Sequence, residues 1–522
     1  MPVTRWTAAL LPLLAALLAA PAAAQRPIPA PAGSPDRYEV PAVPPAAPVA
    51  REEYARRRQA LAREMGDGVL VVMGAIEPDA DYLPFAQSAP FRYLTGITEP
   101  SAVLVMARRG AEVQEHLFVL PRDPSLEVWQ GARLGAEGAT RLTGIPARTT
   151  QQMDDALAEL LRGVRTLYTV APLSPDGSGN PWQRPDQQFV QALQREHGVQ
   201  RVVDLSNDLF RIRMAKSPAE LDLLRRAIYV TNLAQREAIR AVEPGMNEFE
   251  ILALIEGTFR RYGAERPAFN SIVGSGPNAT TLHYRAADRY MQAGDMVVMD
   301  VGASYGGYAA DVTRTVPVNG RFTPEQRAVY ELVLQAQKAA EQEARAGVTL
   351  ARLDQAATRV LAQGLARLGL IESADATYDC GQGQCRQVSL FYLHGLGHGI
   401  GLDVHDPDAS YGSGFVVGSA FTIEPGIYVR ADALDYLPDT PRNRRMIARL
   451  RPAVERYRDI GVRIEDDYFI TERGLERISA GAPREVAEIE ALMAMESFWN
   501  RERRPEMVEW YRGIRPRQPP ER

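Results

Sequence analysis

Three of the chain's six histidines lie within one glycine-rich stretch, from His394 to Asp406. His394 and His398 have the i, i+4 spacing that would bring two imidazoles together on a helix, but four glycines interrupt the stretch. Each glycine costs a helix about 1 kcal/mol relative to alanine, so the pattern predicts a bent loop instead. Small residues between imidazoles favour a backbone that passes close to a metal ion or a peptide. The alternative is a glycine-rich loop with incidental histidines.

Two acidic residues lie on a predicted β-hairpin. Strand-like runs flank Gly306 and Gly307, a pair suited to a two-residue turn. That turn places Asp300 opposite Thr313, and Asp311 then shares the face of Asp300 on the diagonal. Two carboxylates so placed repel each other unless a cation lies between them. A solvated acidic pair is the alternative, but the apolar neighbours of Asp300 favour a metal site.

Further carboxylates follow near the end of the chain. Glu424 ends a predicted strand, and a second strand is predicted over residues 461–471. Within it Arg463, Glu465 and Asp467 alternate onto one face. Four carboxylates and one imidazole are a suitable ligand set for two divalent ions about 3.5 to 4 Å apart. The set comprises Asp300, Asp311, His398, Glu424 and Glu465.

Together these motifs resemble the aminopeptidase P family of pita-bread metallopeptidases, over about residues 51–490. Residues 92–96 and 129–135 are similar to that family's first domain. The resemblance implies two bound divalent ions, with Asp311 and Glu465 bridging them. Carboxylate-rich ligation favours manganese, while zinc and cobalt are compatible. The metal ligands implied are Asp300, Asp311, His398, Glu424 and Glu465, and the catalytic residues implied are His283, His394, His405, Glu424 and Arg463.

The activity implied by this resemblance is that of an exopeptidase. It would release the N-terminal residue from peptides with proline in second position. Alternatives are an Xaa-Pro dipeptidase (prolidase), a creatinase-like hydrolase of the same fold, and a metal-free binding module. Between the positions of His405 and Glu424, prolidases resembling this chain carry a longer insertion with an arginine that captures the dipeptide carboxylate. Residues 406–423 contain no arginine or lysine, which predicts a preference for peptides longer than two residues.

Two domains must position these residues. Residues 51–205 combine strand-like runs with amphipathic helices and predict an α/β N-terminal domain. Residues 206–490 predict an α+β pita-bread catalytic domain, in which helix, helix and strands occur twice as two pseudo-symmetric halves. Helix caps at Ser217 and Thr323 open the two halves. Residues 491–522 form a C-terminal extension without a recognisable pattern.

The N-terminal residues have the pattern of an export signal. Residues 1–24 contain an apolar run and an A-x-A site, which predict a signal peptide, and residues 25–50 are a proline-rich linker. An uncleaved membrane anchor is the alternative, but thirteen apolar residues fall short of the about 20 that span a bilayer. We therefore expect a periplasmic or secreted protein that acts on peptide substrates and does not bind a membrane once the signal is removed.

Composition narrows the partners further. A net charge of -5 without a basic stripe argues against nucleic-acid binding. Cys380 and Cys385 are the only cysteines, and they form either a disulfide or two free thiols. Trp129 lies in a stretch that in tetrameric members of the resembled family reaches a neighbouring active site. That resemblance implies a homo-oligomer, either a dimer or a tetramer.

Overall fold

The computed structural model describes residues 48–77, 85–170, 185–381, 383–408 and 414–502. The predicted signal peptide, nearly all of the predicted proline-rich linker and most of the predicted C-terminal extension lie outside these residues. None of the described helices combines the length and the hydropathy that crossing a bilayer requires.

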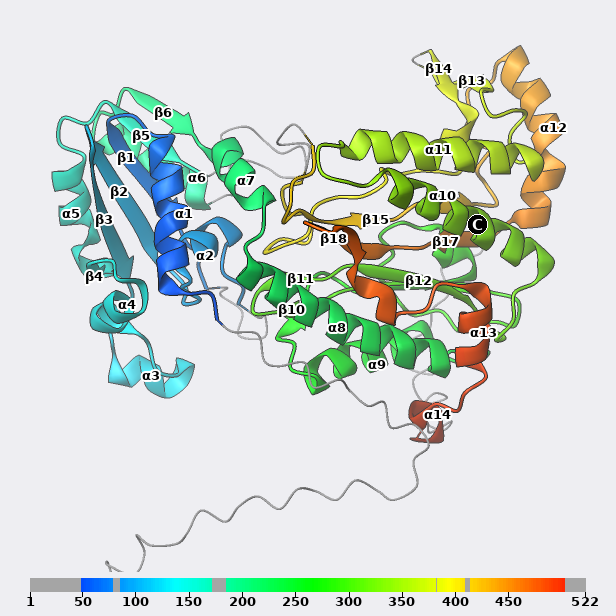
Figure 1. Ribbon diagram of the computed structural model, residues 1–522, viewed down its shortest axis with the longest axis horizontal. Helices are drawn as coiled ribbons and strands as arrows, with labels where there is room; N and C mark the ends of the chain where they lie inside the picture. The colour runs from blue at the N-terminus through cyan, green and yellow to red at the C-terminus, as the bar shows by residue number, and fades with distance from the viewer. Residues whose placement is uncertain (1–47, 78–84, 171–184, 382, 409–413, 503–522) are drawn as a thin grey trace, which may run out of the picture. The chain divides into compact units, whose positions relative to one another are not determined.

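A six-stranded mixed sheet organises residues 68–204, in the order β4-β3-β2-β1-β5-β6. Strand β1 is buried on both faces because its side chains alternate between two cores. Leu70 and Val72 pack with residues of α1, α2, α4 and α7, whereas Val69 and Val71 pack with α5 and α6. Figure 1 shows α1 lying across the sheet. The strands are β1 (Gly68–Met73), β2 (Val103–Arg109), β3 (Glu112–Val119), β4 (Ala147–Thr149), β5 (Thr166–Thr169) and β6 (Arg201–Asp204).

Among the helices of this α/β part, α3 has a side-chain cap. Asp123 accepts hydrogen bonds from the backbone of Ser125 and Leu126 and so begins α3. Helix α5 is one of the amphipathic helices that the sequence predicts for this domain. The helices are α1 (Arg51–Arg63), α2 (Ala89–Thr95), α3 (Pro124–Gln130), α4 (Gly135–Thr143), α5 (Met153–Leu160), α6 (Pro185–Glu196) and α7 (Ser206–Met214).

Two helix pairs, each followed by strands, make up the rest of the described chain. The side chains of Ser217 and Thr323 accept from the backbone three residues on, and Glu220 and Gln326 complete the capping boxes. This repeat is the predicted duplication into two halves. The helices are α8 (Pro218–Ala241), α9 (Glu248–Arg261), α10 (Pro324–Glu343), α11 (Leu350–Arg367), α12 (Pro441–Tyr457), α13 (Val486–Met493) and α14 (Phe498–Glu502).

The strands of the two halves are short and belong to several small sheets. Their orders are β11-β10-β7, β12-β9-β8, β13-β14, β15-β18-β19 and β16-β17. Their bounds are β7 (Arg266–Pro267), β8 (Ile272–Ser275), β9 (Met296–Val301), β10 (Ala303–Tyr305), β11 (Tyr308–Ala309), β12 (Val312–Pro317), β13 (Thr377–Asp379), β14 (Gln384–Arg386), β15 (Ala420–Ile423), β16 (Gly426–Val429), β17 (Ile460–Arg463), β18 (Asp466–Thr471) and β19 (Gly474–Arg477).

The predicted hairpin register is confirmed. Asp300 pairs with Thr313, and the turn residues Gly306 and Gly307 both have positive φ, at 56° and 84°. A type I′ turn requires positive φ at both central positions, which glycine adopts without strain. The strands bend at Gly302, where a Cβ would lie 1.8 Å from a backbone oxygen. This bend separates β9 from β10.

The prediction of one strand over residues 461–471 is wrong. The chain forms β17, leaves the ladder at Ile464 and Glu465, and then forms β18 in a different sheet. The amide of Ile464 donates to the Pro425 carbonyl at 3.3 Å, and the amide of Glu465 donates to the Thr313 carbonyl at 3.1 Å. The backbone therefore changes partners here, which releases Glu465 from the sheet.

Cys380 and Cys385 form a disulfide across the β13–β14 hairpin. The sequence had left open whether they pair or remain free thiols. The side chain of Asn443 on α12 donates to the Asp379 carbonyl at 2.9 Å and so fixes this hairpin.

Candidate metal centre

All nine predicted site residues line one cavity of about 550 Å³. It is formed by both halves of the second domain, because Asp300 and Asp311 come from the first half and the remaining ligands from the second. Its polar lining comprises the predicted ligands Asp300, Asp311, His398, Glu424 and Glu465, the predicted catalytic residues His283, His394, His405 and Arg463, and in addition Asn270 and Arg285.

Interruptions of strands bring most of the carboxylates into this cavity. Asp300 lies in β9, whereas Asp311 immediately precedes β12. Glu424 lies between β15 and β16, and Glu465 lies between β17 and β18. A residue outside a ladder has its backbone free to turn, so the carboxylates converge from separate sheets.

His398 enters the site from the glycine-rich run. The amide of Thr422 donates to the His398 carbonyl at 2.8 Å, so the run lies alongside β15. A Cβ at Gly397 would lie 2.3 Å from the Thr422 carbonyl oxygen, which explains the need for glycine there. The run contains no helix, as the sequence predicted. Close passage of the backbone thus aims the imidazole at the acids.

Three of the predicted ligands already have their ligand atoms close together. One ligand atom each of Asp311, His398 and Glu465 lies within 4.8 Å of the others. His398 Nε2 is 3.6 Å from Asp311 Oδ2, 4.0 Å from Glu465 Oε1 and 3.3 Å from Glu424 Oε1. Asp300 Oδ1 and Asp311 Oδ1 are buried and have no hydrogen-bond partner among the described residues. Buried, unpaired carboxylate oxygens beside an imidazole suit hard divalent cations.

Burial, together with neighbouring charges, raises the pKa values of Asp311, Glu424 and Glu465. Burial, followed by the charge of Glu465, holds the pKa of Asp311 well above its usual range. Burial and the charge of Glu424 do the same for Glu465. Burial raises the pKa of Glu424 to about 8, even though Arg463 opposes the shift. The acids therefore require protons or cations between them, and two dications would match their charge.

Two histidines of the site, His394 and His398, are neutral near pH 7. Burial lowers the pKa of His394 and of His398 to about 4. His398 Nδ1 is 3.0 Å from the Gly399 carbonyl, which assigns the proton to Nδ1 and leaves Nε2 as a metal ligand. Burial also lowers the pKa of His405, whose ring centroid is 4.1 Å from that of His398. His283 is exposed at the cavity wall.

Arg463 and Tyr428 connect the ligands to His394. The buried guanidinium of Arg463 is paired with the carboxylate of Asp300 and donates to Tyr428 Oη at 2.8 Å. Tyr428 Oη in turn lies 2.8 Å from His394 Nε2. Tyr428 lies on β16 and was missed by the sequence analysis, because a lone tyrosine in an apolar strand carries no functional signal. Its hydroxyl fixes the imidazole and the guanidinium relative to each other.

The far end of the glycine-rich run is anchored by two cations from the segment around the end of α7. Arg213 pairs with the carboxylate of Asp406, and Lys216 Nζ lies 3.0 Å from its Oδ2. Lys216 also donates to the Pro407 carbonyl at 3.3 Å. Although burial favours the neutral acid, the two cations hold the pKa of Asp406 below its usual value. Asp406 follows His405 directly, so this ion pair fixes that histidine's backbone.

Comparison with known proteins agrees with this geometry. Residues 222–472 match metallopeptidase family M24, and residues 54–168 match the aminopeptidase P N-terminal domain. The chain is 36% identical to a Haemophilus influenzae Xaa-Pro aminopeptidase, over 85% of this chain and 97% of the relative. The chain belongs to metallopeptidase family M24. An Escherichia coli Xaa-Pro aminopeptidase is 34% identical, over 85% of this chain and 98% of the relative.

The fold agrees with the same family. A solved structure of Escherichia coli aminopeptidase P with the inhibitor Pro-Leu superposes with a TM-score of 0.72 at 33% identity. The superposition covers 86% of this chain and 99% of that one. The second domain is therefore the pita-bread catalytic domain of an M24 peptidase, and M24 membership implies divalent metal ions at the clustered acids.

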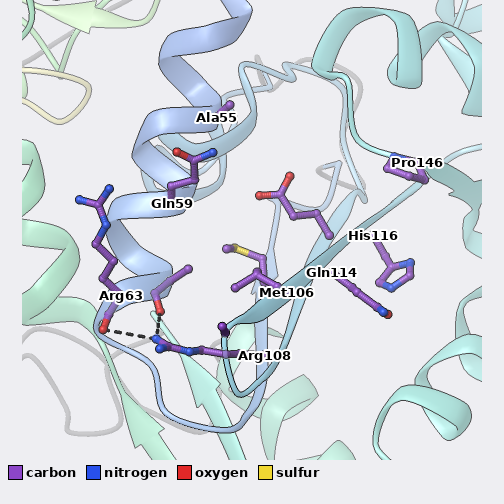
Figure 2. A pocket seen from close by; sticks show the side chains of 12 residues that line it. Ala55, Gln59, Arg63, Met106, Arg108, Gln114, His116 and Pro146 are labelled. Atoms are coloured by element: carbon purple, nitrogen blue, oxygen red, sulfur yellow. Dashed lines mark hydrogen bonds between the residues drawn. The ribbon is translucent and has the colours of Figure 1, made fainter.

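The N-terminal part of this M24 chain contains a larger cavity of about 760 Å³ between α1 and the β2–β3 hairpin (Figure 2). Arg108 spans one end of it by donating to the carbonyls of Ala62 and Met65, at 2.6 and 2.5 Å. Glu115 is the one acid in its lining, and it is paired with Arg58 at 3.0 Å. A single paired acid cannot hold a dinuclear centre, so the metal site is assigned to the smaller cavity.

Proposed function

We propose that the protein is a metal-dependent exopeptidase that releases the N-terminal residue from peptides with proline in second position. One observation carries the proposal: every residue that the family resemblance implied lines the same cavity, with unpaired carboxylate oxygens beside a neutral imidazole. Relatives named Xaa-Pro aminopeptidase cover 85% of the chain and support the same activity.

The metal proposed is manganese, as two ions. The carboxylate-rich donor set favours it over softer metals. Asp300, Asp311, His398, Glu424 and Glu465 would hold the ions, with Asp311 and Glu465 between them. Bound ions of this kind lower the pKa of a water molecule and polarise the scissile carbonyl.

The protein's own groups would then move protons and stabilise charge. Glu424 lines the cavity 3.3 Å from His398, so as a carboxylate it could take a proton from the attacking water and release it to the leaving nitrogen. The imidazole of His405 can donate to the carbonyl oxygen as it gains charge. His394 has its Nδ1 at 2.8 Å from the Gly395 carbonyl and its Nε2 at 2.8 Å from Tyr428 Oη, so it would shape the cavity wall beside that oxygen. His283, on the exposed wall, would contact the peptide.

The proposed preference for proline in second position is supported by a relative. The inhibitor Pro-Leu of the Escherichia coli structure begins with proline, as the released fragment of an Xaa-Pro peptide does. We infer that the same cavity here accepts such a fragment.

The position of Arg285 supports Xaa-Pro dipeptidase activity as a second candidate function. Two guanidiniums line the cavity, and that of Arg463 is engaged by Asp300 and Tyr428. Arg285 is exposed and makes no ion pair with any described residue. It could bind the free carboxylate of a dipeptide, a function that residues 406–423 cannot supply. If Arg285 does not bind a dipeptide carboxylate, the absence of arginine and lysine from residues 406–423 favours peptides longer than two residues.

Steady-state kinetics of the manganese-loaded protein test the proposal. We expect kcat/KM to be far higher for Xaa-Pro-Yaa-Zaa than for Xaa-Ala-Yaa-Zaa, and Glu424→Gln to lower kcat while the variant stays folded. Equal rates on both peptides would refute the proline selectivity. A preference for the dipeptide Xaa-Pro over the tetrapeptide would assign the protein to the dipeptidases.

We also propose that the protein is exported and forms a homo-oligomer, a dimer or a tetramer. Export rests on the leader sequence of residues 1–24. The oligomer rests on helix α3, in which no residue is buried and Trp129 and Val128 are 85% and 80% exposed. Large apolar side chains exposed side by side favour a second copy as partner. Sedimentation of the wild type against Trp129→Ala checks this, and a fully active wild-type monomer would contradict it.

A further inference from the structure

Two buried glutamines occupy related places in the two halves of the catalytic domain. Gln235 lies on α8 and Gln337 on α10, the first helix of each half, and both side chains are fully buried. Burying an amide away from water is unfavourable unless its donors and acceptor find partners. Both amide nitrogens find them in the backbone next to the metal ligands.

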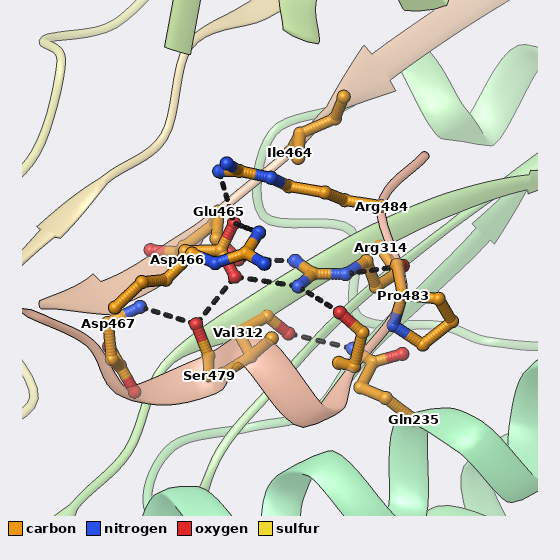
Figure 3. A network of polar contacts seen from close by, with 12 residues as sticks. Gln235, Val312, Arg314, Ile464, Glu465, Asp466, Asp467, Ser479, Pro483 and Arg484 are labelled. Carbon is orange, nitrogen blue, oxygen red and sulfur yellow. Dashed lines mark hydrogen bonds and ion pairs between the residues drawn. The ribbon is translucent and has the colours of Figure 1, made fainter. Parts of the chain in front are cut away.

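Gln235 joins the two strands that carry the first pair of acids. Its Nε2 donates to the Met299 carbonyl at 2.9 Å and to the Val312 carbonyl at 2.7 Å. Met299 directly precedes Asp300, and Val312 directly follows Asp311. Figure 3 shows this side chain reaching Val312 from α8. One amide group therefore bonds to the backbone beside both acids.

Gln337 does the same for the second pair. Its Nε2 donates to the Ile423 carbonyl at 3.0 Å and to the Ile464 carbonyl at 3.2 Å. These residues directly precede Glu424 and Glu465. Glu424 and Glu465 lie at interruptions between strands, in the gap between the ladder pairs Ile423–Asp466 and Gly426–Arg463. The glutamine adds a link between the two segments at this gap.

The surroundings of Gln337 hold its amide in this orientation. Its Oε1 accepts from Arg484 at 2.8 Å, and its Nε2 also lies 3.1 Å from Asp466 Oδ2. Arg314 uses its guanidinium to bind the Asp466 carboxylate and the Glu465 carbonyl, at 2.7 and 2.6 Å (Figure 3). The network is thus tied to the backbone of Glu465 at two points.

The surroundings of Gln235 indicate a role beyond stability. Its Oε1 is buried and has no hydrogen-bond partner among the described residues. Leaving a buried acceptor unpaired costs about 1–3 kcal/mol. A methionine of similar size would fill the space without that cost, so the amide nitrogen must contribute something that packing does not.

We propose that Gln235 and Gln337 are positioning residues, each of which holds the backbone of one pair of ligand carboxylates at a fixed spacing. Gln235 sets the spacing of Asp300 and Asp311, and Gln337 sets that of Glu424 and Glu465. The inference rests on the proposed dinuclear metal function. Outer residues that orient ligands typically contribute about 10- to 100-fold in metal affinity.

Calorimetric titration of Mn²⁺ into metal-free full-length protein tests the inference. We expect Gln235→Met and Gln337→Met to weaken Mn²⁺ binding about 10- to 100-fold. Gln337→Glu keeps the size of the side chain and, when protonated, one of its two donors, so its affinity should fall between wild type and Gln337→Met. At saturating Mn²⁺, the variants should lower kcat more than they change KM.

Gln326→Met is the matched control, because Gln326 is a buried glutamine on α10 that donates to the Gly294 carbonyl, away from the cavity. It should lower the free energy of unfolding and leave Mn²⁺ affinity unchanged. If the Gln235→Met and Gln337→Met variants bind Mn²⁺ with wild-type affinity, the inference is overturned and the proposed function is not. Absence of Mn²⁺ binding by the wild type would overturn the proposed function as well as the inference.

Discussion

Removing the metal ions should make the stability of the protein depend on pH in an unusual direction. In the metal-free protein, burial raises the pKa of Glu424 to about 8 from a usual value of 4.5, and it also raises the pKa values of Asp311 and Glu465. A carboxyl whose pKa is raised by folding binds more protons in the folded state. Its contribution is fully present at low pH and is lost as pH rises towards the folded value.

The window from pH 6.5 to 8 contains the titration of Glu424 and part of that of the histidines. Burial lowers the pKa values of His394 and His398, so at pH 6.5 each is neutral in the folded state and half-protonated in the unfolded state, and each offsets about 0.4 kcal/mol of the loss by pH 8. Burial also lowers the pKa of His405, which acts in the same direction. Each proton bound only by the folded state contributes a slope of about 1.4 kcal/mol per pH unit. Glu424 alone then lowers the free energy of unfolding by about 1.5 to 2 kcal/mol across this window.

Urea unfolding of chelated protein at pH 6.5 and at pH 8 measures the effect. The metal-loaded protein is the first control, since bound cations replace the protons and the loss should be much smaller. Glu424→Gln is the second, because it removes the contribution of Glu424 and should reduce the loss by about 1.5 to 2 kcal/mol. A chelated Glu424→Gln variant that loses as much stability as the chelated wild type between the two pH values would refute the reasoning.

Three further outcomes follow from the site. Asp311→Ala and Glu465→Ala should each lower activity more than about 100-fold, which is the upper effect expected for a residue that only orients a metal ligand. Circular dichroism should show that both variants stay folded. Full activity of either variant after exhaustive chelation would contradict this prediction. Tyr428→Phe removes the hydroxyl between Arg463 and His394 and should lower kcat about 10- to 100-fold, since a hydrogen bond to a charged group contributes about 1.5–3 kcal/mol; an unchanged kcat would separate Tyr428 from catalysis. For substrate length, we expect higher kcat/KM on Xaa-Pro-Yaa-Zaa than on Xaa-Pro; if the dipeptide is preferred instead, Arg285→Gln should raise its KM and leave that of an amidated dipeptide unchanged.

Local signals in the sequence predicted the parts of the fold that local chemistry decides. Ser217 and Glu220 form the expected capping box because its two hydrogen bonds span three residues. The turn at Gly306 and Gly307 set the hairpin register, and with it the face shared by Asp300 and Asp311. Such features need no knowledge of distant residues.

Features that depend on distant partners could not be predicted. Asp466 falls on the apolar face of residues 461–471, but only the carbonyl of Thr313, far away in sequence, shows why the strand breaks at Glu465. Gln235 and Gln337 look like ordinary polar positions on amphipathic helices, because the carbonyls they bind are brought to them by tertiary packing. The family resemblance supplied the ligand set, but it could not supply these supports.

The pairing of Asp406 with Arg213 and Lys216 determines how the chain can be divided for expression. A fragment starting at residue 222, where the M24 match begins, would contain Asp406 but neither cation. Removing the partners of a buried charge costs about 3–5 kcal/mol, a large share of the 5–15 kcal/mol that stabilises a typical protein. The smallest soluble catalytic fragment should therefore begin before Arg213, which places its practical start within α7 rather than at the first helix of the peptidase domain.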